Sequence, residues 1–190
     1  METLRTFIAL ELPEQVKEKL ARLQQKFMDS TSGVRWVKPD NIHLTLKFLG
    51  STRVKKVEEV SMILDRIAQG VSPFVLNVGG IGAFPNPKNP KVIWAGIQAN
   101  ACCAHFQERL ETALAAAGFS REDRPFSPHL TIGRLKDGRM RKELGSLLEE
   151  FSNEHIGRFE ASHVVFFRSD LEPAGPVYAR IKDIELVAKK

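Results

Sequence analysis

The feature that most constrains the fold of this chain is an internal repeat. The segment Pro39–Leu49 aligns with Pro125–Leu135, and the second copy lies 86 residues after the first (129 minus 43 for the shared histidine). Proline, histidine, leucine, threonine and a final leucine match, and a predicted helix follows each copy. With two copies and so long a period, the repeat is not that of a solenoid. It predicts two similar lobes related by a pseudo-two-fold axis.

Each copy predicts a strand that carries one histidine and one threonine on the same face. Side chains alternate between the two faces of a strand, so His43 and Thr45 point the same way, together with Lys47. His129 and Thr131 share a face of the second copy for the same reason. If the lobes face each other, the two histidines and the two threonines line one cleft.

Two imidazoles and two hydroxyls in one cleft suit the attack of water on a cyclic phosphodiester. That reaction needs a base that takes the water proton and an acid, on the opposite side of phosphorus, that protonates the leaving alkoxide. Histidine serves both purposes, because its ordinary pKa of about 6.5 populates either form near neutrality. Threonine hydroxyls can donate to the phosphoryl oxygens as these gain charge. No acidic cluster that would obviously hold a metal stands out in the sequence, and we expect no cofactor.

The rest of the chain predicts an α+β fold. Four segments show apolar residues at helical spacing: Val16–Phe27, Val57–Ile67, Phe106–Ala117 and Met140–Phe151. Eight runs rich in β-branched and aromatic residues predict strands: Leu4–Leu10, Val34–Val37, Ile42–Leu49, Phe74–Val78, Val92–Ile97, His129–Leu135, Phe159–Phe167 and Val177–Leu186. Several strands follow one another directly, so we expect largely antiparallel sheets with amphipathic helices on their outer faces. We treat residues 1–190 as a single bilobal domain.

Composition narrows the class of protein. Of the 190 residues, 43% are apolar and 27% charged, which is typical of a globular protein. Basic residues exceed acidic ones by 28 minus 23, or +5, which is compatible with a phosphate-bearing partner. The cysteines Cys102 and Cys103 are adjacent, which excludes a disulfide framework and a cysteine-based zinc site. The sequence shows neither a signal-peptide pattern nor a long apolar span, so we expect a cytoplasmic protein that binds no membrane.

The two repeated motifs resemble the signature of the two-histidine phosphoesterases, which is a pair of His-x-Thr-x sequences. Here the pair is His43–Leu46 and His129–Ile132. The surroundings resemble one branch of that superfamily, the RNA 2′,3′-cyclic phosphodiesterases, first named 2′-5′ RNA ligases. The flanking segments that carry this likeness are Arg5–Ala9, Val34–Val37, Phe48–Gly50, Gly82–Pro85, Arg134 and Gly175–Tyr178. The likeness spans nearly the whole chain.

The resemblance implies a fold of two antiparallel sheets that flank a central cleft. It also implies metal-independent opening of a 2′,3′-cyclic phosphate to a 2′-phosphate. In the family the histidine of the first motif is taken as the proton donor and that of the second as the proton acceptor. Carried over, His43 would protonate the leaving 3′ oxygen and His129 would activate water. The alternation of side chains does not by itself assign these roles.

Three further residues are candidates for substrate binding: Arg134, Phe48 and Phe126. Alternation puts Arg134 on the face opposite His129, unless a twist or bulge at Gly133 turns it toward the cleft. Each of the two phenylalanines could stack on a base or pack in the core. A predicted basic rim could follow an RNA backbone or simply be solvated: Lys38, Lys47, Arg53, Lys88 and Lys91.

The sequence leaves three functions open. The leading hypothesis is an enzyme that hydrolyses the cyclic phosphate of RNA ends or of small cyclic nucleotides. The second is the reverse reaction, which joins a cyclic phosphate to a 5′-hydroxyl and would use the same two histidines. The third is a non-catalytic protein that binds RNA or nucleotides. Because no unpartnered apolar helix face stands out, we expect a monomer without an obligate protein partner.

Overall fold

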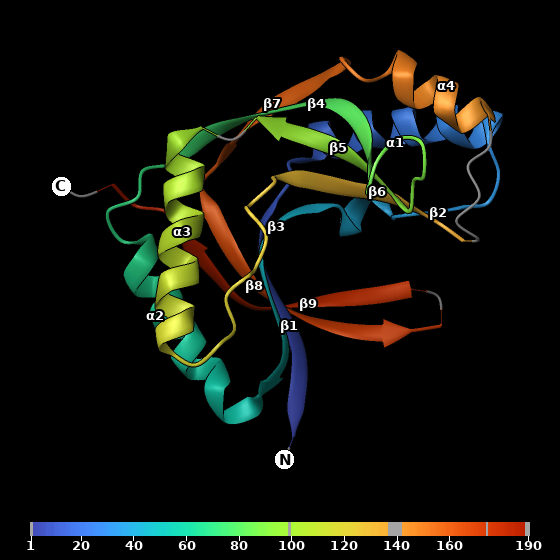
Figure 1. Ribbon diagram of the computed structural model, residues 1–190. Coiled ribbons are helices and arrows are strands. Elements are labelled where there is room, and N and C mark those ends of the chain that lie inside the picture. Colours follow the sequence, from blue (N-terminus) through green and yellow to red (C-terminus); the bar gives the residue numbers. More distant parts are fainter. Residues whose placement is uncertain (1, 99, 137–141, 174, 189–190) are drawn as a thin grey trace.

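The computed structural model describes residues 2–98, 100–136, 142–173 and 175–188 (Figure 1). The strands are β1 (Thr3–Glu11), β2 (Val34–Trp36), β3 (His43–Arg53), β4 (Phe74–Phe84), β5 (Val92–Gln98), β6 (His129–Leu135), β7 (His155–Ala161), β8 (His163–Glu172) and β9 (Gly175–Glu185). The α-helices are α1 (Glu14–Ser30), α2 (Val57–Ala68), α3 (Ala101–Ala116) and α4 (Lys142–Glu150). Short 3-10 helices, η1 (Pro39–Asn41) and η2 (Val54–Lys56), precede β3 and α2. The predicted α+β class is confirmed.

The strands form one sheet in which every pair of neighbours is antiparallel. Its order is β7-β4-β5-β6-β3-β1-β8-β9, and β2 pairs with the free part of β6. One half contains β1, β3, β8 and β9, and the other contains β4 to β7 with β2 (Figure 1). The two sheets expected from the sequence are therefore continuous, because β3 and β6 meet in the middle.

The junction between β3 and β6 lies on the pseudo-two-fold axis. The strands are bridged at a single residue pair, Leu44 opposite Leu130. These two leucines are equivalent positions of the repeat, since 130 minus 44 is again 86. A residue that pairs with its own equivalent marks a local two-fold axis. Beyond this pair the two strands diverge, which opens the sheet into two halves.

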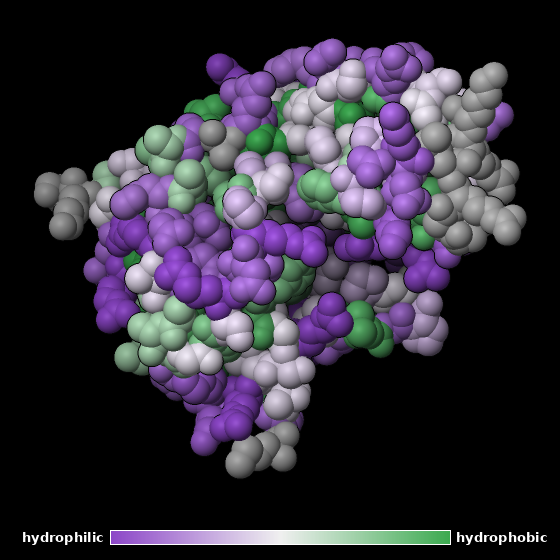
Figure 2. Space-filling view, in the orientation of Figure 1, coloured by the Kyte–Doolittle hydropathy of each residue, from purple (hydrophilic) through white to green (hydrophobic). Residues whose placement is uncertain are grey.

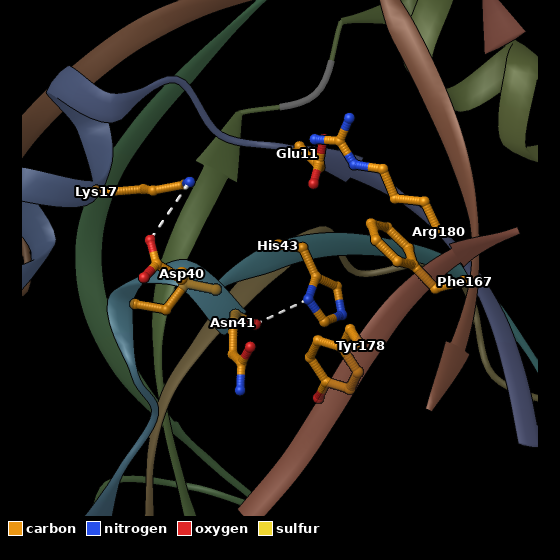
Figure 3. A pocket seen from close by; sticks show the side chains of 9 residues that line it. Glu11, Lys17, Asp40, Asn41, His43, Phe167, Tyr178 and Arg180 are labelled. Carbon is orange, nitrogen blue, oxygen red and sulfur yellow. Dashed lines mark hydrogen bonds and ion pairs between the residues drawn. The ribbon is translucent and has the colours of Figure 1, made fainter. Parts of the chain in front are cut away.

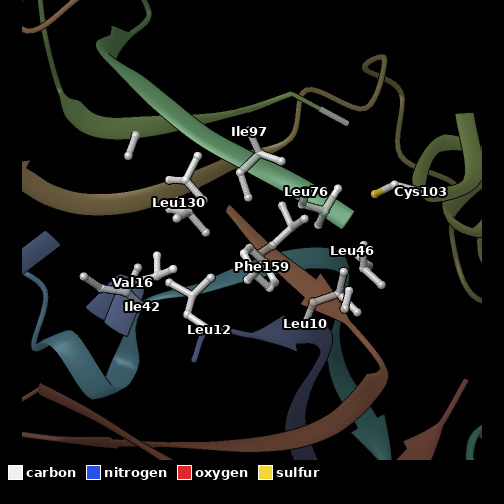
Figure 4. Close-up of a cluster of buried hydrophobic side chains, with 14 of the residues drawn as sticks. Leu10, Leu12, Val16, Ile42, Leu46, Leu76, Ile97, Cys103, Leu130 and Phe159 are labelled. Carbon is white, nitrogen blue, oxygen red and sulfur yellow. The ribbon is translucent and has the colours of Figure 1, made fainter. Parts of the chain in front are cut away.

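One hydrophobic core covers the side of the sheet that carries the helices. Leu44, Leu46, Leu130 and Ile132 are all at most 3% exposed and belong to one buried cluster with helix residues such as Leu20 and Leu110. Figure 4 shows that this cluster gathers side chains from both halves, among them Leu10, Leu46, Leu76 and Leu130. The apolar side chains of the two motifs therefore point inward, as alternation predicts, and the motif histidines and threonines lie on the other face of the sheet.

Several element boundaries differ from the sequence-based prediction; strand β4, for example, runs on to Phe84, beyond the predicted end at Val78. The run predicted as one strand, Phe159–Phe167, is the end of β7 and the start of β8, with Ser162 between them. No glycine or proline marks the break, and the run Val164–Phe167 that follows it is buried on both faces. Met140, at the start of the predicted fourth helix, lies outside the described residues.

Over the residues that are described, no helix is long and apolar enough to cross a membrane.

Candidate active site

The four motif side chains surround the Leu44–Leu130 pair. Antiparallel register around this pair places His43 across from Thr131, and Thr45 across from His129. All four side chains are half-buried and lie on the face opposite the buried leucines. His43 of β3 and His129 of β6 are therefore diagonal neighbours across the Leu44–Leu130 pair. The structure thus brings together the four residues that the sequence singles out.

The two imidazoles are held in the same way. His43 Nδ1 lies 2.8 Å from the carbonyl oxygen of Asn41, and His129 Nδ1 lies 2.7 Å from that of Ser127. A carbonyl oxygen can only accept, so Nδ1 carries the hydrogen in both rings. Nε2 is then the atom that gains or loses a proton, and each ring can act as a base when neutral and as an acid when protonated.

The surroundings of the two histidines differ. The His43 ring stacks on Phe7 with a centroid distance of 4.7 Å and meets the edge of Tyr178 at 5.3 Å. Burial among these rings lowers the pKa of His43 from 6.5 to about 4, although the hydrogen bond to the Asn41 carbonyl favours the charged form. In the free protein His43 is therefore neutral at pH 7. His129 meets the ring of Phe84 edge-to-face, with 4.9 Å between the centroids.

The lowered pKa of His43 predicts that acid weakens the fold. Since the unfolded pKa is near 6.5 and the folded pKa about 4, the unfolded state binds more protons between these values. Stability is complete above about pH 6.5 and falls as the pH drops toward 4, by up to about 3 kcal/mol from this group. Urea unfolding of the wild type and of His43→Gln at several pH values measures this loss. His43→Gln should lose less stability than wild type, whereas His105→Gln, at an exposed position on α3, should follow wild type.

A bulge in β3 reverses the alternation after Thr45. Ala9 of β1 is opposite Thr45, but its neighbour Ile8 is opposite Lys47, so Leu46 is an extra residue in β3. Leu46 and Lys47 consequently both point inward, and Lys47 is 5% exposed. The prediction that Lys47 shares the face of His43 and belongs to a basic rim is wrong. Its Nζ donates to Glu111 Oε2 at 2.7 Å and to the Ser120 carbonyl oxygen at 2.9 Å.

The same bulge turns Phe48 outward. Its side chain is 63% exposed, and its ring lies 6.1 Å from that of Phe7, which in turn stacks on His43. Core packing therefore does not explain Phe48. It forms the exposed end of a row of aromatic rings that leads to the first histidine, where a base could stack.

An equivalent bulge occurs in β6. Trp94 of β5 is opposite Thr131, whereas Ile93 is opposite Gly133, so Ile132 is the extra residue. Ile132 and Gly133 both point inward, and Arg134 is exposed on the face of His129 and Thr131. A side chain on Gly133 would not fit, because its Cβ would approach Val34 and Trp36 to 2.9–3.0 Å. The sequence left open whether Arg134 points toward the cleft. The bulge at Ile132 directs it there.

Basic side chains from both halves surround the cleft. Arg134 lies directly opposite Arg35 of β2, an arrangement that is unfavourable unless an anion is nearby. Within the described ranges, neither guanidinium forms an ion pair with a carboxylate. Burial raises the pKa of Tyr178, while the charges of Arg134 and Arg5 oppose that rise. Arg134 of one half is therefore close enough to act electrostatically on Tyr178 of the other.

A pocket of about 210 Å³ adjoins His43. Figure 3 shows the His43 imidazole beside Tyr178 and Phe167, with its bond to Asn41 drawn. The remaining wall is charged: Arg180 Nη2 donates to Glu11 Oε2 at 2.5 Å, and an ion pair of 3.7 Å joins Lys17 and Asp40. In Figure 2 the mostly hydrophilic surface is hollowed between the β8–β9 hairpin and the half that contains β6.

Some residues of the site escaped the sequence analysis, and one candidate lies elsewhere. The aromatic neighbours of the histidines come from β1, β4, β8 and β9; Phe84 lies in the flanking segment Gly82–Pro85, whereas nothing in the sequence marked Phe167 as a site residue. Phe126 is half-buried and packs against the main core, and Trp36 does the same beside Phe27. His163 is exposed, and its Nδ1 lies 2.9 Å from Asp183 Oδ1. Among the described residues, no group of three or more His, Cys, Asp or Glu side chains could hold a metal ion.

Comparison with known proteins places this arrangement in a family. A family profile described as LigT like Phosphoesterase matches twice, over residues 10–94 and 100–178, one match for each copy of the motif. Proteins named RNA 2′,3′-cyclic phosphodiesterase are similar over almost their whole length. That of Methanocaldococcus jannaschii is 36% identical over 95% of this chain and 99% of its own. That of Methanothermobacter thermautotrophicus is 34% identical over 96% and 98%.

Solved structures agree with these sequence matches. The crystal structure of TT0787 of Thermus thermophilus superposes with a TM-score of 0.82 at 29% identity, and covers 96% of this chain and 98% of its own. E. coli LigT complexed with 3′-AMP has a TM-score of 0.77 at 23% identity, over 97% and 99%, which shows a common fold. The paired matches, the full-length relatives and the repeated strand geometry lead to one conclusion. This chain belongs to the LigT-like phosphoesterase family.

Proposed function

We propose that the protein hydrolyses the 2′,3′-cyclic phosphate at RNA ends to a 2′-phosphate, by acid–base catalysis with its two histidines and without a metal ion. The observation that carries this proposal is the symmetric pair His43 and His129, each with Nδ1 bound to a carbonyl and Nε2 free to exchange a proton. The family relationship supports it, because relatives at 34–36% identity are named RNA 2′,3′-cyclic phosphodiesterase.

In the proposed mechanism the phosphate lies between the two imidazoles. His129 Nε2 takes a proton from the attacking water, and His43 Nε2 protonates the 3′ oxygen as its bond to phosphorus breaks. Thr45 and Thr131 donate hydrogen bonds to the phosphoryl oxygens, and Arg134 neutralises their charge. Phe48 offers a face on which a base stacks. The assignment of acid and base follows the family resemblance.

Burial of His43 affects how this acid obtains its proton. With a pKa near 4, the free protein holds His43 neutral at pH 7. A phosphodiester anion close to Nε2 favours the charged imidazole and raises this pKa. Binding of the substrate therefore favours protonation of His43 at Nε2, and His43 then passes this proton to the leaving 3′ oxygen. We infer that substrate binding and protonation of His43 are coupled.

The site requires both halves of the sheet, so we propose that the chain acts as one bilobal unit. His43, Thr45 and Phe48 come from β3, whereas His129, Thr131 and Arg134 come from β6. No residue from a second copy is needed to complete this set, and we propose that the protein acts as a monomer on RNA ends or cyclic nucleotides in the cytoplasm.

Hydrolysis of an oligonucleotide with a 2′,3′-cyclic phosphate end, in the presence of EDTA, tests the proposed function. We expect full conversion to a product with a 2′-phosphate, identified by its resistance to a 3′-specific phosphatase and by mass. Formation of a 3′-phosphate, or loss of activity with EDTA, would contradict the mechanism. An added 5′-hydroxyl oligonucleotide tests for ligation, and ligated product in excess of hydrolysed product would favour the reverse reaction. Binding without turnover would leave only a nucleotide-binding role.

A further inference from the structure

Gln24 is a buried polar residue that belongs to neither motif. It lies on the inner face of α1 and is 2% exposed. Its Nε2 donates two hydrogen bonds, one to the Val37 carbonyl oxygen at 2.8 Å and one to the Ile132 carbonyl oxygen at 2.9 Å. Because both acceptors are main-chain carbonyls, the amide nitrogen must face them, and both of its hydrogens are used.

The two carbonyls bound by Gln24 belong to the segments that carry the two motifs. Ile132 is the extra residue of the β6 bulge that turns Arg134 toward the cleft. Val37, just after β2, donates its own N–H to the Ile132 carbonyl oxygen at 3.0 Å. From Val37 the chain continues through η1 to Asn41, whose carbonyl oxygen holds the His43 ring. One side chain therefore fixes the bulge after His129 to the segment before His43.

The other half of the molecule has a similar hydrogen bond from a buried glutamine to a bulge. Gln107 of α3 is 7% exposed and donates from Nε2 to the Leu46 carbonyl oxygen at 3.5 Å. Leu46 is the repeat equivalent of Ile132 and the extra residue of the β3 bulge. In each bulge, the carbonyl oxygen of the extra residue thus accepts a hydrogen bond from a buried glutamine of the helix that packs beneath the strand. A bulge leaves main-chain groups outside the regular ladder, and a buried carbonyl needs a donor.

We propose that Gln24 is a positioning residue of the active site, which acts by holding the β6 bulge that directs Arg134 toward the phosphate. Without its two hydrogen bonds the bulge can relax toward regular alternation, which would turn Arg134 away from His129. The inference deepens the proposed function, since Arg134 is expected to contact the substrate phosphate.

A double-mutant cycle between Gln24→Met and Arg134→Ala tests the proposal. Methionine has nearly the size of glutamine but no donor. Each single change is expected to lower kcat/KM for the cyclic phosphate by about 10-fold or more. In the Gln24→Met background, Arg134→Ala should lower kcat/KM by less than about threefold. The guanidinium is then already turned away from the phosphate, so its removal changes little. Costs that multiply, or an active Gln24→Met enzyme, would overturn the proposal.

A control separates this role from ordinary packing. Val16→Ala removes a buried side chain from the same helix two turns earlier, and Val16 is 3% exposed. It should lower the Tm, yet leave kcat/KM within about twofold of wild type and preserve the full cost of Arg134→Ala. If Val16→Ala also abolishes the effect of Arg134→Ala, Gln24 has only a packing role.

Two further measurements cover the remaining outcomes. Should Gln24→Met fail to fold, Gln24→Glu keeps the size, and its protonated carboxyl can donate one bond. Its activity relative to wild type should rise as the pH falls, and a constant ratio would contradict the proposal. If wild type hydrolyses no cyclic phosphate, the proposed function fails. The inference then rests on a crystal structure of Gln24→Met, in which Arg134 should have left the face of Thr131; an unchanged bulge would refute it.

Discussion

Replacing either His43 or His129 with alanine is expected to lower kcat/KM for a 2′,3′-cyclic phosphate by about 10²–10⁴-fold, which is the usual contribution of a general acid or base. Both side chains are half-buried at the cleft and outside the core, so the variants should remain folded. The double variant should be far less impaired than the product of the two single effects, because residues that act as a unit are not additive. Initial rates on a defined oligonucleotide, at fixed pH, measure all three.

Two comparisons make this experiment specific. Thr45→Val and Thr131→Val keep the shape of the side chain and remove one donor to the phosphoryl oxygens, so each should cost about 1–3 kcal/mol in transition-state stabilisation, less than either histidine. His163→Ala removes an exposed histidine on β8 that is bound to Asp183, and should leave activity intact. An inactive His163→Ala beside an active His129→Ala would move the chemistry away from the two motifs.

The largest expected effect on stability comes from the buried ion pair between Lys47 and Glu111. Both side chains are at most 6% exposed, and their charged atoms are 2.7 Å apart. Removing one partner leaves the other charge buried without compensation, so Glu111→Leu should destabilise the fold by about 3–5 kcal/mol. The double variant Lys47→Met with Glu111→Leu should recover most of that loss, because two apolar residues of similar volume can replace a buried pair. Urea denaturation measures the free energy of unfolding of all variants.

An exposed ion pair that also involves a glutamate of α3 provides the control. Arg121 and Glu108 are 2.6 Å apart, but their side chains are 51% and 63% exposed. Solvent screens such a pair, so Glu108→Ala should cost no more than about 1 kcal/mol. Equal losses for the buried and the exposed pair would show that Lys47 is not buried in solution.

The sequence predicted the site up to the point where regular alternation stops. His43, Thr45, His129 and Thr131 precede the bulges, so a period of two residues places them on the correct face. Lys47 follows a bulge, and the same rule puts it on the wrong face. A bulge depends on neighbouring strands and on donors such as Gln24, which lie far away in the sequence. The tertiary contacts decide the register there, and no local pattern reveals them.

The fold was predictable where an element has one apolar face, and less so where it is buried on both. Helix α1 matches the stripe of Val16, Leu20, Leu23 and Phe27. The run around Val165 and Phe166 lacks such a stripe, since one side packs on the main core and the other on the cluster of Phe7 and Phe167. No glycine or proline marks Ser162, where β7 ends and β8 begins, so the sequence predicts a single strand there.

The order of strands in the sheet also determines when the site can form during synthesis. Strand β1 pairs with β8, and Thr6 lies opposite Arg168, a separation of 162 residues (168 minus 6). Pairings at such distance slow folding, because a long loop must close before the contacts form. Until β8 and β9 leave the ribosome, one edge of β1 stays unpaired and can associate with other chains. The half of the sheet that contains His43 is therefore completed last, although His43 itself is translated early.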